Sequence, residues 1–199
     1  MEGAINTENK EPNRSRRILL CDITGKVGEH LLPEEALVSS PVRCLNRAVD
    51  LKPELVVVLI DLIPFKEREA LVELSAVLKR NSHTRKCLVL ALLHSKHRKL
   101  IDDLNRAGVD FVKYIGGIKL DSSQMQKIID ELGPDDRLER HLAVLCPFLH
   151  YREIDAQHEL TVCGAYRNRM VLGGHRMHEI CETENHLLCE YYLNPRISS

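Results

Sequence analysis

Five short apolar runs constrain the fold of this chain more than any other feature of its sequence. "RILLCDI" begins at Arg17, and "PVRCL", "ELVVVLIDL", "CLVLALL" and "DFVKYI" follow before Gly116. Each run is rich in Val, Ile or Leu, and a longer segment of mixed charge follows it. Continuous apolar strands that alternate with amphipathic helices are typical of a parallel sheet covered on both faces. The pattern therefore predicts an α/β domain over residues 17–133, with a flavodoxin-like, doubly wound parallel sheet of five strands.

The segments between these runs carry the apolar stripes of helices, with apolar residues three or four positions apart. In "KEREALVELSAVLKRN" and "SKHRKLIDDLNRAG" the stripes consist of Leu71, Leu74, Val77, Leu78, Leu100, Ile101 and Leu104. The segment "DSSQMQKIIDELG" predicts a last helix that Asp121 caps and that stops at Gly133-Pro134. We place the domain boundary at that stop.

The stretch from Lys52 to Ile115 resembles the central part of a bacterial response-regulator receiver domain. It matches in the Lys-Pro pair before the third predicted strand, in Pro64 after it, in "TRKCLVLAL" and in the turn "RAGVDFV". The resemblance covers about residues 17–132. It implies the receiver fold and a part in signal transduction, in which the domain contacts a protein partner or a second copy of itself.

Receiver domains bind Mg²⁺ and a phosphoryl group through acidic residues at the carboxyl edge of the sheet, and this chain departs from that pattern. After the first strand only Asp22 is acidic. The position of the phosphoacceptor Asp is occupied by Leu59 or Ile60, and Asp61 lies one or two residues after it. Receiver domains have a lysine at the end of the fifth strand, and Lys113 lies two residues before that position. One carboxylate cannot replace the charge of three around Mg²⁺. We therefore expect a receiver-like scaffold without phosphorylation, with Asp22 and Asp61 as a weak vestigial acidic site.

The composition changes beyond Pro134, in residues 134–199. Lysine does not occur after Lys127, and the segment holds few large apolar residues for a core. A helix over residues 137–145, with three leucines on one side, docks this segment against the α/β domain. A unit of this size with so little aliphatic surface needs a covalent or metal staple. A reducing cytoplasm disfavours disulfides, so the sequence predicts a small, cysteine-rich domain stapled by metal.

Four of the chain's seven cysteines are the predicted ligands: Cys146, Cys163, Cys181 and Cys189. The intervals between them are 16, 17 and 7 residues. Structural zinc sites usually pair ligands two to four residues apart, and no such pair occurs here. A four-iron cubane accepts cysteines from separate loops, and Cys146-Pro147 is similar to the Cys-Pro that ends many ferredoxin cluster motifs. We therefore favour an iron–sulfur cluster of the 4Fe-4S type, with zinc as the alternative.

Other side chains have both a functional and a plain structural interpretation. Cys21, Cys44 and Cys87 lie in apolar runs and are expected to be small buried hydrophobic residues. Five histidines are candidates to replace one thiolate or to lie on the surface, namely His150, His158, His175, His178 and His186. Four arginines either offset the charge of a cluster or form a solvated face, namely Arg152, Arg167, Arg169 and Arg176.

The overall composition gives no support to nucleic-acid or membrane binding. The chain has 199 residues, of which 44% are hydrophobic and 29% charged, and its formal net charge is -1. Residues 1–16 are expected to be a disordered tail because they are polar, and they lack the apolar core of a signal peptide. No stretch stays apolar over the roughly 18 residues of a membrane span. The expected location is the cytoplasm.

No catalytic motif indicates an enzyme, and "TGKVG" at residues 24–28 lacks the residues of a phosphate-binding loop. We expect a non-enzymatic regulatory or sensory protein in which the cysteine site responds to redox state or iron supply. One alternative is an adaptor with a purely structural zinc site. Another is an accessory subunit that transfers electrons or whose cluster serves a partner's catalysis.

Overall fold

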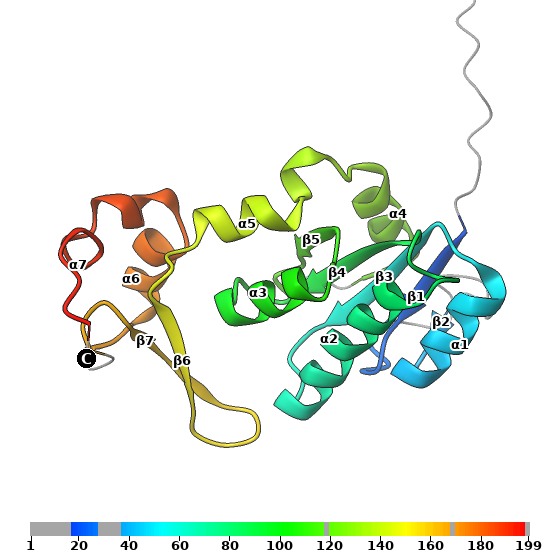
Figure 1. Ribbon diagram of the computed structural model, residues 1–199, viewed down its shortest axis with the longest axis horizontal. Helices are drawn as coiled ribbons and strands as arrows, with labels where there is room; N and C mark the ends of the chain where they lie inside the picture. Colours follow the sequence, from blue (N-terminus) through cyan, green and yellow to red (C-terminus); the bar gives the residue numbers. More distant parts are fainter. Residues whose placement is uncertain (1–16, 28–36, 118–119, 168–169, 198–199) are drawn as a thin grey trace, which may run out of the picture.

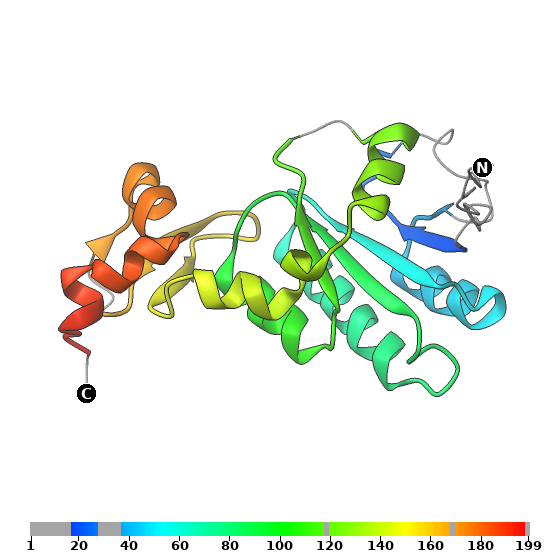
Figure 2. The same cartoon turned by 90° about the horizontal axis from the view of Figure 1, so that it is seen from above.

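A computed structural model describes residues 17–27, 37–117, 120–167 and 170–197 of the chain. The predicted disorder of residues 1–16 lies outside the described residues. Figures 1 and 2 show two parts, a larger α/β lobe (residues 17–145) and a smaller tail (residues 146–197), joined through helix α5.

The α/β lobe is built on the predicted five-stranded sheet. Its strands are β1 (Ile18–Cys21), β2 (Leu37–Val38), β3 (Leu55–Ile60), β4 (Leu88–Leu93) and β5 (Phe111–Tyr114). All neighbouring strands are parallel, in the order β2-β1-β3-β4-β5. This is the flavodoxin-like order, in which the chain reverses its direction of winding between β1 and β3. The fold class of the lobe was therefore predicted correctly.

The apolar run "PVRCL" was predicted to be a strand, and this prediction is wrong. The run forms the start of helix α1 (Pro41–Leu51). The side chain of Ser40 caps this helix by accepting a hydrogen bond from the Arg43 N–H at 3.3 Å. Pro41 occupies the first helical position, where its missing N–H is not needed. Local capping therefore outweighs the apolar pattern, and the second strand is the shorter β2.

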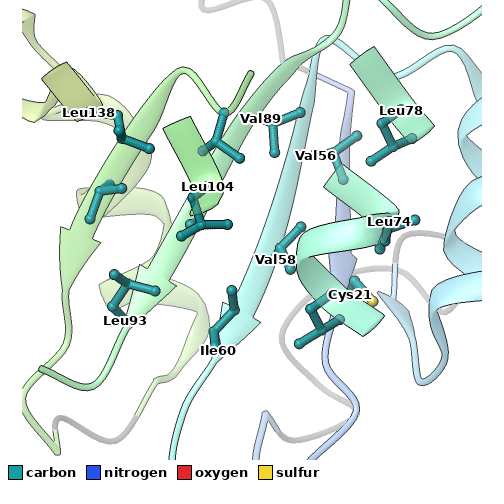
Figure 3. Packing of buried hydrophobic residues seen from close by; sticks show 14 of the residues in the cluster. Cys21, Val56, Val58, Ile60, Leu74, Leu78, Val89, Leu93, Leu104 and Leu138 are labelled. Atoms are coloured by element: carbon teal, nitrogen blue, oxygen red, sulfur yellow. The ribbon is translucent and has the colours of Figure 1, made fainter. Parts of the chain in front are cut away.

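Helices cover both faces of the sheet, as Figure 2 shows from above. They are α2 (Phe65–Arg80), α3 (Arg98–Arg106), α4 (Ser122–Asp130) and α5 (Leu138–Val144), in addition to α1. Side chains of α1, α2, α3 and α5 pack on one face with Val56, Val58 and Ile60 of β3 (Figure 3). Met125 and Ile129 of α4 pack on the other face.

The predicted helical stripes are buried, with one exception. The leucines of α2 and the three apolar residues of α3 belong to the core, whereas Val77 is only half-buried. Ser75 is buried instead, and its hydroxyl donates a hydrogen bond to the Leu71 carbonyl at 2.9 Å. Asp121 caps α4 as predicted, because its carboxylate accepts from the Gln124 N–H at 2.8 Å.

The packing of α5 continues the lobe beyond Gly133, the predicted boundary. A short 3-10 helix, η2 (Pro134–Asp136), leads into it. Leu138 and Leu145, which flank α5, are 0% and 2% exposed and lie in the core on the face of α2 and α3. The composition of the sequence therefore changes several residues before the packing changes.

The tail consists of a three-stranded antiparallel sheet and short helices. Its strands are β6 (Leu149–Glu153), β7 (Glu159–Cys163) and β8 (Met170–Val171), in that order. The helices are α6 (Gly174–Arg176), the π-helix η3 (Met177–Cys181), the 3-10 helix η4 (Glu184–Leu188) and α7 (Glu190–Leu193). The buried residues of its core are three cysteines, two leucines and an alanine, namely Cys146, Leu149, Cys163, Ala165, Leu172 and Cys181. Larger side chains such as Phe148, Tyr191 and Tyr192 pack against them but are only partly buried.

In the part of the chain that the structure describes, no helix combines the length and the apolar character that a membrane crossing needs.

Candidate metal centre and the adjoining sheet edge

The four cysteines proposed as ligands line one pocket in the tail. Cys146 follows α5, Cys163 ends β7, Cys181 ends η3, and Cys189 precedes α7. Residues that are far apart in the sequence and belong to four separate elements therefore converge. The convergence is part of the backbone structure, because the Cys146 N–H donates to the Cys181 carbonyl at 2.8 Å.

Gly164, directly after Cys163, allows the strand that carries this cysteine to approach β6. Its N–H donates to the Phe148 carbonyl at 2.7 Å. A Cβ atom at this position would lie 2.9 Å from Nε2 of His150 and 3.2 Å from the Phe148 carbonyl oxygen. A larger residue would therefore require the His150 side chain to move and the backbone at Phe148 to shift slightly.

Two thiols of the pocket, those of Cys146 and Cys181, have raised pKa values. Burial, followed by the charges of the other three cysteines, raises the pKa of Cys181 to about 12. Burial also raises the pKa of Cys146. Thiolates that face one space repel one another, so deprotonation of all four requires a cation.

The pocket has no ready geometry for a single metal ion. Within the described residues, no three His, Cys, Asp or Glu side chains are grouped so that they could hold one. The cavity between the cysteines has a volume of about 10 Å³, which is room for about one water molecule. The residue types match a metal–thiolate centre, but the loops would have to rearrange around a bound metal.

His186 is the candidate histidine that lines the pocket, and it is 3% exposed. Its Nδ1 donates to the Thr183 carbonyl at 2.7 Å. Three of the other candidates are near acidic residues instead, in the pairs His158–Asp155, His175–Glu179 and His178–Glu182. His150 packs beside Gly164.

Arg176 is the candidate arginine at the pocket, with Nη2 3.9 Å from the Cys189 sulfur. Its guanidinium also lies over the ring of Tyr191, 5.3 Å from the ring centroid. Arg152 lies on β6, Arg167 follows β7 with a left-handed backbone (φ 54°), and Arg169 lies outside the described residues. Of the candidate arginines that the structure describes, Arg176 is the one placed at the pocket.

The other cysteines are buried in the α/β lobe, as expected, although Cys44 lies in α1 and not in a strand. Cys87 precedes β4 and is 5% exposed. Cys21 and Cys44 contact each other, and their hydrogen bond, followed by burial, raises the pKa of Cys44.

Asp61 lies directly after β3, at the carboxyl edge of the parallel sheet. Nζ of Lys26 is 2.6 Å from one of its oxygens, and Nδ1 of His94 is 3.0 Å from the other. Burial opposes ionisation of Asp61, but the Lys26 hydrogen bond and the charges of Lys26 and His94 hold its pKa below the usual value. Its carboxylate is therefore ionised and neutralised by protein side chains.

The carboxylate of Asp22 accepts hydrogen bonds from the loop that follows it. One oxygen accepts from the Thr24 N–H at 2.8 Å and from the Thr24 hydroxyl at 2.6 Å, and the other accepts from the Val27 N–H at 2.8 Å. Asp22 is 2% exposed. Lys113 pairs with Asp136 at 2.8 Å. The structure therefore does not assemble these residues around Asp61 as the acidic site of a receiver domain requires.

We expect the α/β lobe to remain unphosphorylated when the protein is incubated with acetyl phosphate and Mg²⁺, because Lys26 occupies the carboxylate that Mg²⁺ would need. Phosphate-affinity electrophoresis measures this, with Asp61→Asn as the control. A shifted band in the wild type that disappears in the Asp61→Asn protein would contradict the expectation.

Sequence reasoning missed the residues that join this sheet edge to the tail. Lys96, His97 and Arg98 follow β4 and contact the tail through hydrogen bonds, and Glu159 of β7 receives one of them. The basic run "HSKHRK" directly after a buried strand was the available signal. Polar residues after parallel strands gather at the carboxyl edge, where such sheets place their functional sites.

No protein-family model matches the chain, and no curated protein matches it. Among solved structures, a response regulator from Desulfuromonas acetoxidans matches 58% of this chain and 94% of its own, with 16% sequence identity and a TM-score of 0.41. A likeness of this size carries no argument about function. The strand order alone defines the class of the lobe, an α/β protein with a flavodoxin-like sheet.

Proposed function

We propose that this chain is a non-enzymatic regulatory protein in which a metal–thiolate centre in the tail controls contacts of the α/β lobe with a protein partner. Cys146, Cys163, Cys181 and Cys189 are the proposed ligands. The single observation that carries the proposal is that these four residues, from four separate elements, line one pocket.

We favour an iron–sulfur cluster over a zinc ion because of the spacing of the ligands along the chain. Structural zinc sites usually pair ligands two to four residues apart, whereas these four are separated by 16, 17 and 7 residues. A cubane cluster is larger than an ion and takes its ligands from separated loops. Arg176 beside Cys189 is a donor to a negatively charged cluster. When bound, the cluster supplies a redox-sensitive link between the four elements.

The thin core of the tail explains how such a centre would regulate. Three of the six buried residues of its core cluster are proposed ligands, and the larger side chains around them are only partly buried. Because the ligands make up half of this cluster, loss of the metal is expected to loosen the tail while the α/β lobe stays folded. The change of structure in the tail then alters the surface that the protein presents to its partner, and this change is the proposed regulatory response.

The colour of the protein tests the proposal. Protein purified without oxygen is expected to be brown, with a broad absorption shoulder near 400 nm and about four irons and four sulfides per chain. Colourless protein with about one zinc per chain would support the structural adaptor instead. Protein that contains neither metal, and binds neither on reconstitution with iron and sulfide or with zinc, would contradict the proposal.

A further inference from the structure

The loop of residues 94–98 consists of the connection after β4 and Arg98, the first residue of α3, and it lies where the carboxyl edge of the sheet meets the tail. Figure 1 shows α3 and the start of β6 on the same side of the lobe. Three consecutive basic residues of this loop, Lys96, His97 and Arg98, each bind a different part of the tail or its connection.

Arg98 holds the backbone that leads into Cys146. Its Nη1 donates to the carbonyls of Leu145 at 2.7 Å and Leu142 at 3.1 Å. These carbonyls belong to the C-terminal end of α5, where a positive charge is favourable.

Lys96 holds the backbone next to another ligand, Cys181. Its Nζ donates to the Glu182 carbonyl at 3.0 Å. The Cys146 N–H in turn donates to the Cys181 carbonyl. Two of the four cysteines are therefore joined to each other through the backbone, and each is joined to the same loop of the α/β lobe.

His97 extends these contacts to the strands of the tail. Its Nδ1 accepts from the Leu100 N–H at 3.0 Å, so Nε2 carries the proton that it donates to Glu159 at 2.7 Å. The His97 ring also stacks on Tyr151 of β6, with centroids 3.7 Å apart. The Tyr151 hydroxyl accepts from the Arg98 N–H at 2.9 Å. Glu159 begins β7, the strand that ends at Cys163.

The other end of the loop reaches the edge of the sheet. His94 is 3.0 Å from Asp61. Both residues line a cleft of about 480 Å³, together with His97 and Glu159. Any movement of the loop thus changes both the surroundings of Asp61 and the shape of this cleft.

We propose that the loop of residues 94–98 couples the four-cysteine centre to the carboxyl edge of the sheet, with Lys96 as its anchor to the tail backbone beside Cys181. This inference rests on the proposed function, because it requires a metal at the cysteines. Loss of the metal frees the tail backbone at Glu182, so the loop loses its anchor at Lys96, whereas Leu145 stays in the core of the α/β lobe.

Hydrogen exchange of the full-length protein tests this coupling. Protein reconstituted with iron and sulfide is compared with metal-free protein, and exchange is followed over residues 94–98. We expect exchange in this segment to accelerate about tenfold on metal removal, as a local opening would cause, while β3 and β4 stay protected. In Lys96→Met the response should fall below about twofold, because the anchor at Glu182 is absent.

Lys99→Met is the matched control, since Lys99 is 65% exposed and pairs with Asp103 on its own helix. It should respond like the wild type. Metal content is measured for every variant and should equal that of the wild type. A wild type that binds metal but shows no change over residues 94–98 would overturn the coupling alone, as would a Lys96→Met protein that responds fully. A wild type that binds no metal would overturn the proposed function and the coupling with it.

Discussion

Cys181→Ala or Cys189→Ala is expected to release most of the metal from the tail, because each substitution removes one of four ligands to a shared centre. Loss of a partner that only supports a ligand already weakens metal binding about 10–100-fold, so the loss of a ligand should weaken it at least as much. Residues 146–197 should then exchange amide hydrogens faster and be cut more readily by proteases. Iron, sulfide and zinc analysis of anaerobically purified protein measures the first effect.

Cys87→Ala is the control for these variants, since Cys87 is as buried as Cys181, at 5% against 6% exposed, but lies in the α/β lobe. Its metal content should equal that of the wild type. Equal metal in the wild type and in both ligand variants would remove the proposed site, whatever metal the protein contains.

Leu138→Ala is expected to lower the free energy of unfolding of the α/β lobe by about 2–5 kcal/mol, the usual range for a buried leucine. Leu138 is 0% exposed and packs with the residues of Figure 3, so its loss leaves a cavity beside α3. Urea unfolding followed by circular dichroism measures the change. Leu62→Ala is the control, because Leu62 is 71% exposed, and it should change the stability by less than about 0.5 kcal/mol.

If Leu138→Ala also changed the free energy of unfolding by less than about 0.5 kcal/mol, α5 would belong to the tail and not to the lobe. The predicted boundary at Gly133 would then describe the folding units better than the packing does.

Much of the α/β lobe could be predicted because burial on both faces leaves a strong pattern. β3 and β4 are apolar at every position, and this is typical only of strands covered on two sides. The interpretation of "PVRCL" was wrong because an apolar run of that length does not distinguish a strand from the start of a buried helix. The helix begins there because of Ser40 and Pro41, two residues whose side chains act on the backbone.

The cysteine pocket was predictable in its members but not in its shape. The shortage of large apolar residues after Pro134 indicated that the tail needs further stabilisation, and four cysteines remained as candidates. Which histidine and which arginine lie at the pocket depends on tertiary structure. His186 and Arg176 gave no stronger signal in the sequence than His175 or Arg152.

The contacts of Lys96 and Arg98 differ from ordinary ion pairs in their acceptors, which are main-chain carbonyls at positions 142, 145 and 182. Every amino acid supplies the same oxygen atom at those positions, so substitutions there leave the acceptor intact. Evolutionary constraint on this interface would then fall on the two basic residues alone. In a set of related sequences, these contacts would not appear as correlated substitutions between the two sides of the interface. They would appear as two conserved basic residues after the fourth strand of the sheet.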